Sequence, residues 1–108
     1  MRIYVACPYS NPDPQVLIDR FEAANKAAAS LIAAGHIVFS PISHSHPISL
    51  HMGNSLDHGV WLAQDRAFLD WCDAVYVLMA PGWEQSKGVA WEIGYARKHG
   101  KHVTYIGG

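Results

Sequence analysis

Three residues in the segment 86–96 have types and spacing that could support chemistry at the start of a helix. Ser86 suits the N-cap, because its hydroxyl can accept a hydrogen bond from the amide of the second or third helical residue. Gly88 lets a ligand approach the backbone, and the free amides and dipole of a helix start favour anions. Successive helical residues turn by ~100°, which places Glu92 near the face of Gly88. Glu92 is either a nucleophile or general base under a phosphate or sugar, or an ordinary surface glutamate.

The elements that must position this segment alternate between strands and helices. Apolar runs over 2–6, 36–40, 73–79 and 102–106 predict strands, and amphipathic stretches over 14–34, 60–72 and 86–99 predict helices. Asp13 suits the N-cap of the first helix, with Pro14 at its first position and Gly35 at its left-handed end. The order β-α-β-α-β-α-β predicts one α/β domain over residues 1–108. We expect a three-layer open parallel sheet of about four strands with helices on both faces, as in flavodoxin-like and Rossmann-like proteins.

Sheets of this kind bind ligands beyond the carboxyl ends of their strands. Tyr9 and Ser10 follow the first strand, His44 follows the second, and Trp83 precedes the helix of Glu92. We therefore expect these loops to converge, with Tyr9, Trp83 and His44 available to contact a flat ring. The glycine-rich fingerprints of dinucleotide-binding and P-loop proteins are missing from the sequence, which disfavours those cofactors.

The segment 41–59 follows the second strand, reads as an irregular loop and is rich in histidine. Imidazole and carboxylate groups suit zinc, so a metal-dependent hydrolase is one hypothesis. The spacing matches no familiar ligand pattern, however, and the sequence therefore predicts no metal site. The residues concerned are His44, His46, His51, Asp57 and His58.

Composition narrows the classes of partner. The net charge of −1 and the scattered basic residues disfavour nucleic acid as a partner. The first apolar run is short and soon interrupted by Pro8, which argues against a signal peptide or membrane span and predicts a cytoplasmic protein. Cys7 and Cys72 have no metal or redox spacing, so we expect them to be small buried side chains.

The residues now assembled resemble the nucleoside 2-deoxyribosyltransferase superfamily, which includes the 2′-deoxynucleoside 5′-monophosphate N-glycosidases. The match comprises a strand-one tyrosine, an aspartate seven residues before the Cys-Asp pair at the third strand segment, and a serine-glycine-glutamate helix start. These are Ile3-Tyr4-Val5, Asp65 before Cys72-Asp73, and Ser86-x-Gly88-x-x-x-Glu92-x-Gly94-x-Ala96.

This resemblance implies a mechanism without a metal or organic cofactor. The family's glutamate, here Glu92, attacks the anomeric carbon of deoxyribose and forms a glycosyl-enzyme intermediate. Its tyrosine, here Tyr4, holds that carboxylate, and its aspartate, here Asp65, assists departure of the base. Two successive displacements lower the barrier, as in a retaining glycosidase.

The resemblance also implies a small-molecule substrate, a nucleoside or nucleotide. At the position of Ser86 the family's transferases have aspartate, whereas its nucleotide hydrolases have serine, which tolerates a 5′-phosphate. The segment 7–12 lacks the arginine-rich phosphate loop of those hydrolases, which leaves Ser10 and Lys87 as candidate phosphate contacts. A non-catalytic nucleotide-sensing module is the alternative function. A homo-oligomer is expected, since so small a core gains from a neighbour and the family uses one to close its site.

Overall fold

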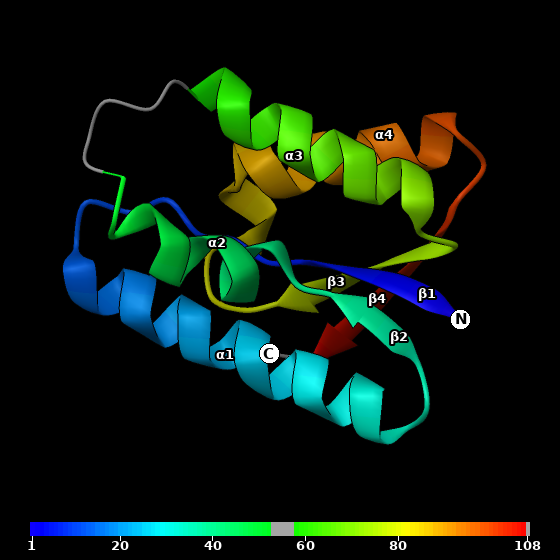
Figure 1. Ribbon diagram of the computed structural model, residues 1–108, viewed down its shortest axis with the longest axis horizontal. Helices are drawn as coiled ribbons and strands as arrows, with labels where there is room; N and C mark the ends of the chain where they lie inside the picture. The colour runs from blue at the N-terminus through cyan, green and yellow to red at the C-terminus, as the bar shows by residue number, and fades with distance from the viewer. Residues whose placement is uncertain (53–57, 108) are drawn as a thin grey trace.

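The described residues of the computed structural model, 1–52 and 58–107, form one parallel sheet flanked by helices (Figure 1). The strands pair in the order β2-β1-β3-β4, and every pairing is parallel. This confirms the predicted open parallel sheet. In chain order the elements are β1 (Arg2–Ala6), α1 (Pro14–Ala33), β2 (Ile37–Phe39), α2 (Pro41–Ser49), α3 (His58–Trp71), β3 (Ala74–Met79), the 3₁₀ turn η1 (Trp83–Gln85), α4 (Lys87–Lys98) and β4 (His102–Gly107).

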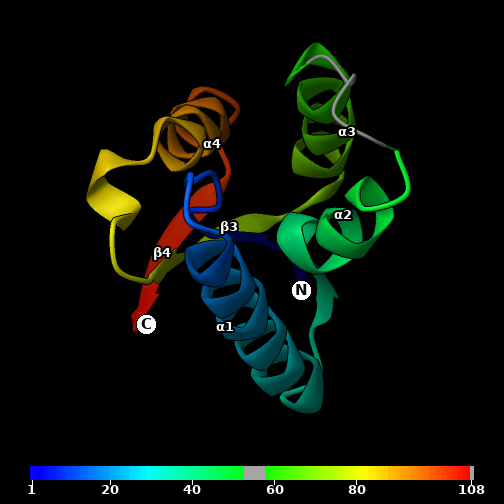
Figure 2. The same ribbon diagram turned by 90° about the vertical axis from the view of Figure 1, so that its left-hand side faces the viewer.

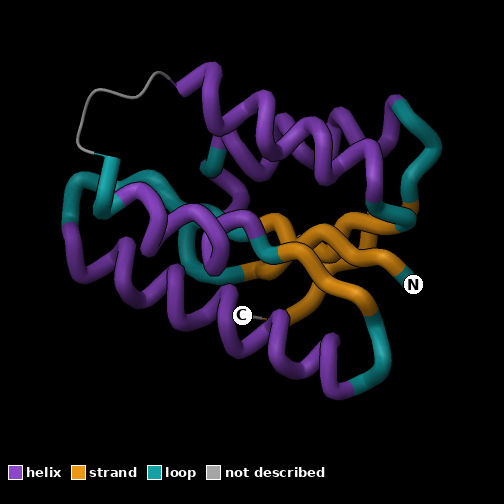
Figure 3. The backbone as a smooth tube through the Cα atoms, in the orientation of Figure 1, coloured by secondary structure: helices purple, strands orange, loops and turns teal. Residues whose placement is uncertain are grey.

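Helices cover both faces of the sheet (Figures 2 and 3). The buried side chains form two separate apolar clusters. The first cluster lies under α3 and α4, and the second lies under α1 and α2. Successive strand residues point to opposite faces, so β3 supplies both clusters, with Val75 and Val77 in the first and Leu78 in the second. The first includes Tyr4, Ala6, Leu69, Cys72, Val75, Val77, Val89 and Ala96; the second includes Cys7, Ala24, Ile42, Leu78 and Ala80.

Helix α1 has the ends that its sequence predicts. The side chain of Asp13 accepts a hydrogen bond of 2.9 Å from the amide of Gln15, and Pro14 opens the helix. Gly35 has a φ of 96°, the left-handed conformation that glycine adopts without strain. Ala24 and Ala28 are buried, and their small side chains let the helix lie close to the sheet.

The expectation of an irregular segment over 41–59 is wrong for its first half, which forms α2. Pro41 lies in the first turn, where its missing amide hydrogen is harmless, although Pro47 lies inside the helix. Serine, histidine and proline are poor helix formers, so packing of the buried Ile42 against α1 must outweigh local preference. Asp57 lies outside the described residues, while the backbone of His58 already belongs to α3.

The start of β3 is fastened to the start of β1. Asp73 accepts hydrogen bonds of 2.9 Å from the Arg2 amide and 3.0 Å from its guanidinium. These bonds lower the pKa of Asp73 to about 2. Within the described part of the chain, no helix combines the length and apolar character needed to cross a membrane.

Candidate active site

The order of the strands identifies the edge at which a ligand would bind. The chain leaves β1 towards β2 on one side, and later returns to place β3 on the other side. In open α/β sheets, such a reversal opens a crevice beyond the carboxyl ends of the two central strands. Helix α4 follows β3 and begins at this edge.

The start of α4 has the predicted cap. Ser86 has an extended backbone, and its Oγ accepts a hydrogen bond of 3.2 Å from the amide of Val89, the third helical residue. A Cβ added at Gly88 would approach only Ser86 Oγ, at 3.8 Å. Packing therefore does not require glycine at this position, and the space beside its backbone is open.

Glu92 is buried, with 7% of its surface exposed, so the interpretation as a surface glutamate is wrong. Val89 and Ala96 share its buried helix face. The hydroxyl of Tyr4, a fully buried residue of β1, donates a hydrogen bond to Glu92 Oε2. Burial of a carboxylate without such a partner would be strongly unfavourable. The two residues therefore form one polar unit inside the first apolar cluster.

Burial dominates the electrostatics of this unit. It raises the pKa of Glu92 to about 8, the hydrogen bond from Tyr4 opposes the rise, and the charge of Asp65 adds to it. Burial, followed by the charges of Glu92 and Asp65, raises the pKa of Tyr4, so its hydroxyl remains a donor. Asp65 is half-buried on α3 and acts electrostatically on both partners. The structure thus brings together all three residues with predicted catalytic roles.

An aromatic wall, defined here as Phe39, Phe68 and His44, lies beside Tyr4. The rings of Phe39 and Phe68 stack with centroids 3.6 Å apart, and His44 lies 5.4 Å from Phe39. Tyr4 and Phe39 have centroids 6.1 Å apart. The sequence reasoning missed both phenylalanines. Phe68 follows Asp65 by three residues, a spacing that places both on one helix face and could have identified it.

Trp83 takes a different position on the same side of the sheet. It packs against the first apolar cluster, and its ring lies 5.6 Å from that of Tyr105. It therefore flanks the start of α4, whereas the aromatic wall borders α2 and α3.

Tyr9 and Ser10 are not brought to Glu92. Tyr9 packs with the second apolar cluster, and its hydroxyl lies 2.5 Å from Nδ1 of His46. The ring of Phe21 lies against the other side of His46, at 4.5 Å. Ser10 is exposed, and its carbonyl oxygen accepts a hydrogen bond from Arg20.

Arg20 joins two of the loops at this edge, a role that the sequence did not predict. Its Nη1 donates to the carbonyls of Tyr9 and Ser10 at 3.2 and 3.1 Å, and its Nη2 donates to that of Pro81 at 3.2 Å. A Cβ at Gly82 would lie 2.7 Å from Arg20 Nη2, and Gly82 has a φ of 90°. The loop that leads to Ser86 is therefore held against the loop that follows β1.

Comparison with known proteins agrees with this fold. The family model described as "Domain of unknown function (DUF1937)" matches residues 1–107. The chain belongs to the DUF1937 family. No curated protein matches the DUF1937 chain significantly.

Two solved structures resemble the DUF1937 chain. A 2-deoxyribosyltransferase from Bacillus psychrosaccharolyticus has a TM-score of 0.68 and 23% identity, with 99% of this chain and 72% of that one covered. A 2-deoxyribosyltransferase from Leishmania mexicana has a TM-score of 0.64 and 19% identity, with 98% and 63% covered. This chain therefore spans less than two thirds of the second enzyme. These likenesses confirm that the fold is that of the 2-deoxyribosyltransferases.

The histidines of the DUF1937 chain are dispersed. His44 borders the aromatic wall, whereas His46 lies beside Tyr9 in the second cluster. Over residues 1–52 and 59–107, no three His, Cys, Asp or Glu side chains are grouped as metal ligands would be. The parts of the metal hypothesis that depend on Asp57 and on the side chain of His58 lie outside what the structure describes.

Proposed function

We propose that this protein cleaves or transfers the N-glycosidic bond of a deoxyribonucleoside or its 5′-monophosphate. The observation that carries the proposal is the buried carboxylate of Glu92, held by the Tyr4 hydroxyl at a helix start beside Asp65. A buried glutamate with a strongly perturbed pKa at the ligand-binding edge of the sheet is a candidate for catalysis. The same fold in two 2-deoxyribosyltransferases supports this choice of reaction.

In the proposed first step, an ionised oxygen of Glu92 attacks the anomeric carbon and forms a bond to it. The bond from that carbon to the base nitrogen breaks, and its electron pair leaves with the base. Asp65 assists this departure by supplying a proton. Water or a second base then attacks the same carbon and passes a proton to Asp65. The bond from the carbon to Glu92 breaks and frees the carboxylate, so the sugar retains its configuration.

The start of α4 would bind the 5′ end of the sugar. Ser86 presents an uncharged hydroxyl there, and the open space beside Gly88 gives a ligand access to the backbone. The helix dipole favours a phosphate at this position. Arg20 already donates to three carbonyls, which leaves Ser86, Gly88 and Lys87 as the proposed phosphate contacts.

The base would lie on the opposite side of the anomeric carbon from Glu92, near Asp65. The aromatic wall of Phe39, Phe68 and His44 borders this region and offers ring surface for stacking. Trp83 flanks the start of α4 and would contact the sugar side.

The direct test is release of free base from a panel of deoxynucleosides and their 5′-monophosphates. Wild type, Glu92→Gln and Glu22→Gln are compared, each with and without a chelator; Glu22 is exposed on α1 and serves as the matched control. We expect release by wild type and Glu22→Gln, unaffected by chelator, and loss in Glu92→Gln. Thermal stabilisation by a nucleotide without release would favour the nucleotide-sensing alternative. Release that chelator abolishes would favour a metal-dependent hydrolase.

A further inference from the structure

The two carboxyl groups of the proposed reaction lie on different helices. Asp65 belongs to α3 and Glu92 belongs to α4, and these helices lie side by side over the same face of the sheet (Figures 1 and 2). Both carboxyl groups act electrostatically on Tyr4 of β1, which fastens Glu92 to the sheet through its hydrogen bond. The distance between the two carboxyl groups therefore depends on how α3 is held against α4.

Tyr95 links α4 directly to α3. Its hydroxyl donates a hydrogen bond of 2.5 Å to Oδ1 of Asp70. This hydrogen bond raises the pKa of Tyr95, so the hydroxyl remains a donor. The ring of Tyr95 contacts two rings of its own helix, with centroid distances of 5.5 Å to Trp91 and 4.1 Å to His99. These residues lie one turn before and one turn after Tyr95, and their contacts restrict the direction of its hydroxyl.

Lys101 connects the ends of the same two helices. Its backbone amide donates a hydrogen bond of 2.9 Å to the carbonyl of Ala96 in α4. Its Nζ donates to the carbonyls of Asp70 and Cys72, at 2.9 and 2.6 Å. The last carbonyls of a helix have no partner within that helix, and a lysine side chain can satisfy them. Both the side chain and the backbone of Asp70 are thus bonded to the segment 95–101.

This connection lies close to the two carboxyl groups and on the side away from the ligand-binding edge. Helix α3 ends just before β3 begins, and α4 begins just after β3 ends, so both helices run away from that edge. Tyr95 follows Glu92 by three residues, a displacement of ~4.5 Å along the helix axis. Asp70 follows Asp65 by five residues, a displacement of ~7.5 Å. The hydrogen bond can therefore fix the spacing of the carboxyl groups without contacting the substrate.

We propose that Tyr95 and Asp70 are positioning residues, which hold α3 at the distance from α4 at which Asp65 can protonate the base that Glu92 displaces. The roles of the two carboxyl groups in this inference rest on the proposed function. Both groups act on the same sugar–base bond, and a misplacement of ~1 Å at such a site can cost about 100-fold in rate. Asp70 is exposed, so loss of its hydrogen bond should change folding stability little.

Base release is compared among wild type, Tyr95→Phe, Asp70→Ala, the variant with both changes, and Asp70→Asn. We expect kcat to fall about tenfold in each of the first two variants, with KM nearly unchanged. The variant with both changes should lose no more, because the two single substitutions remove one shared hydrogen bond. Asp70→Asn should retain most of the activity, since its amide oxygen can still accept from the Tyr95 hydroxyl.

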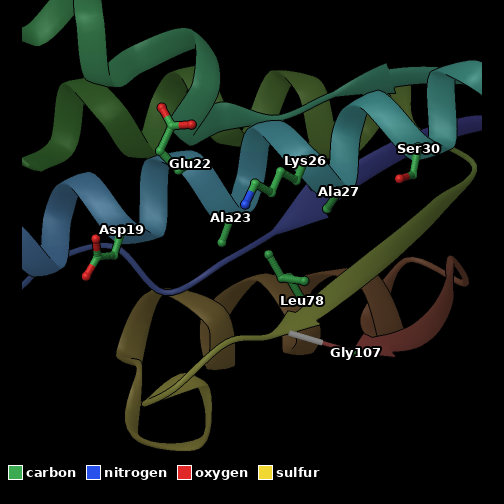
Figure 4. Close-up of a pocket in the computed structure, with 8 residues that line it drawn as sticks. All are labelled: Asp19, Glu22, Ala23, Lys26, Ala27, Ser30, Leu78 and Gly107. Carbon is green, nitrogen blue, oxygen red and sulfur yellow. The ribbon is translucent and has the colours of Figure 1, made fainter.

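Asp19→Ala is the matched control for Asp70→Ala. Asp19 is also an exposed helical aspartate, and it accepts a hydrogen bond of 2.9 Å from the side chain of Gln15. It lies on α1, at a hollow of about 520 Å³ whose lining includes Leu78, on the other face of the sheet (Figure 4). We expect wild-type kcat in Asp19→Ala.

The pKa of Glu92, followed by NMR of its isotopically labelled carboxyl carbon, is a readout that does not require turnover. Burial raises this pKa, and the charge of Asp65 adds to the rise. When α3 is less firmly held against α4, the contribution of Asp65 weakens. We therefore expect the pKa of Glu92 to fall in Tyr95→Phe and Asp70→Ala and to stay in place in Asp70→Asn. A general loss of stability would lower the folded fraction without moving this pKa.

The two measurements separate failure of this inference from failure of the proposed function. An unchanged pKa of Glu92 in Tyr95→Phe and Asp70→Ala would overturn the inference, whatever the activity. A loss of kcat in the variant with both changes that equals the product of the two single losses would also overturn it. A lowered pKa of Glu92 without base release by wild type would support the connection between the helices and overturn the proposed reaction instead.

Discussion

Tyr4, on the central strand β1, donates its hydroxyl hydrogen to Oε2 of Glu92 in α4. Both residues are buried, so this hydrogen bond acts in a region of low effective dielectric constant. It fixes the orientation of the carboxylate and lowers its pKa against the effect of burial. A tyrosine in this position can thus both aim a nucleophile and keep part of it ionised.

Removing that hydroxyl should slow the reaction without preventing folding. We expect Tyr4→Phe to lower kcat by about 10- to 100-fold, the factor that corresponds to one hydrogen bond to a charged group. The pH at which kcat/KM rises should move upward, because the bond that lowers the pKa of Glu92 is gone. Tyr105→Phe is the matched control, since the Tyr105 hydroxyl accepts from Arg97 on the surface. Wild-type kcat in Tyr4→Phe would contradict the orienting role.

The pKa of Glu92 also makes stability depend on pH. Its value is raised from 4.5 to about 8, so between these pH values the folded chain holds a proton that the unfolded chain releases. The associated stability is present below pH 4.5 and is lost as pH rises towards 8. We therefore expect the melting temperature of Glu92→Gln, relative to that of wild type, to rise between pH 4.5 and about 8. Above this range the difference between the two melting temperatures should stay constant. Parallel curves would show that Glu92 titrates normally.

Substitution of two glycines of α4 can distinguish an effect on ligand access from an effect on helix stability. Neither Gly88 nor Gly94 has a neighbour closer than 3.8 Å to an added Cβ. Alanine at either position should stabilise the helix by about 0.5–1 kcal/mol, measured by urea unfolding. We expect Gly88→Ala also to lower kcat/KM tenfold or more by obstructing the substrate, whereas Gly94→Ala should retain activity. Equal activity in both variants would remove the helix start from the binding site.

The residue at the cap should decide between nucleosides and nucleotides. Aspartate caps helices as well as serine does, so Ser86→Asp should fold normally. Its negative charge would repel a 5′-phosphate, and we expect the ratio of kcat/KM for nucleotide to nucleoside to fall tenfold or more. Ser86→Ala should lose about 0.5–2 kcal/mol of stability and lower that ratio less than Ser86→Asp does, because it removes a proposed phosphate contact without adding a repelling charge. An unchanged ratio in Ser86→Asp would place the phosphate elsewhere.

Arg20 should contribute to stability through the two loops that it joins. Arg20→Ala removes three hydrogen bonds to carbonyl groups and should cost about 2 kcal/mol in the free energy of unfolding. Arg20→Lys can replace only part of this geometry, because an ammonium lacks the planar fork of a guanidinium. We expect its loss to be intermediate by urea unfolding. An unchanged free energy of unfolding in Arg20→Ala would show that the two loops keep their positions without these hydrogen bonds.

Local chemistry was sufficient to predict the strands, three helices, and the caps of α1 and α4. Asp13, Gly35 and Ser86 act through neighbours in the chain, so their roles can be read from adjacent residues. Helix α2 could not be predicted in this way, because it depends on burial of Ile42 against a helix that precedes it. Its sequence alone favours an irregular loop.

The site was only partly predictable, because it also depends on contacts between residues that are distant in the sequence. The helical spacing of Ser86, Gly88 and Glu92 identified the segment, while the burial of Glu92 depends on the sheet beneath it. Its contact with Tyr4 was expected only through a family resemblance. The bonds of Arg20 depend on the directions of three carbonyls, and residue types do not encode those directions.

The bond between Tyr4 and Glu92 joins positions that are 88 residues apart. We expect this contact to form late in folding, after β1 has paired with β3, because the entropy of closing a long loop is lost before the contact can repay it. A polypeptide released before α4 would contain the central strand and no carboxylate to meet it. After denaturation, the proposed activity would therefore return only when the whole domain has folded. The circular dichroism signal of the helices could return earlier.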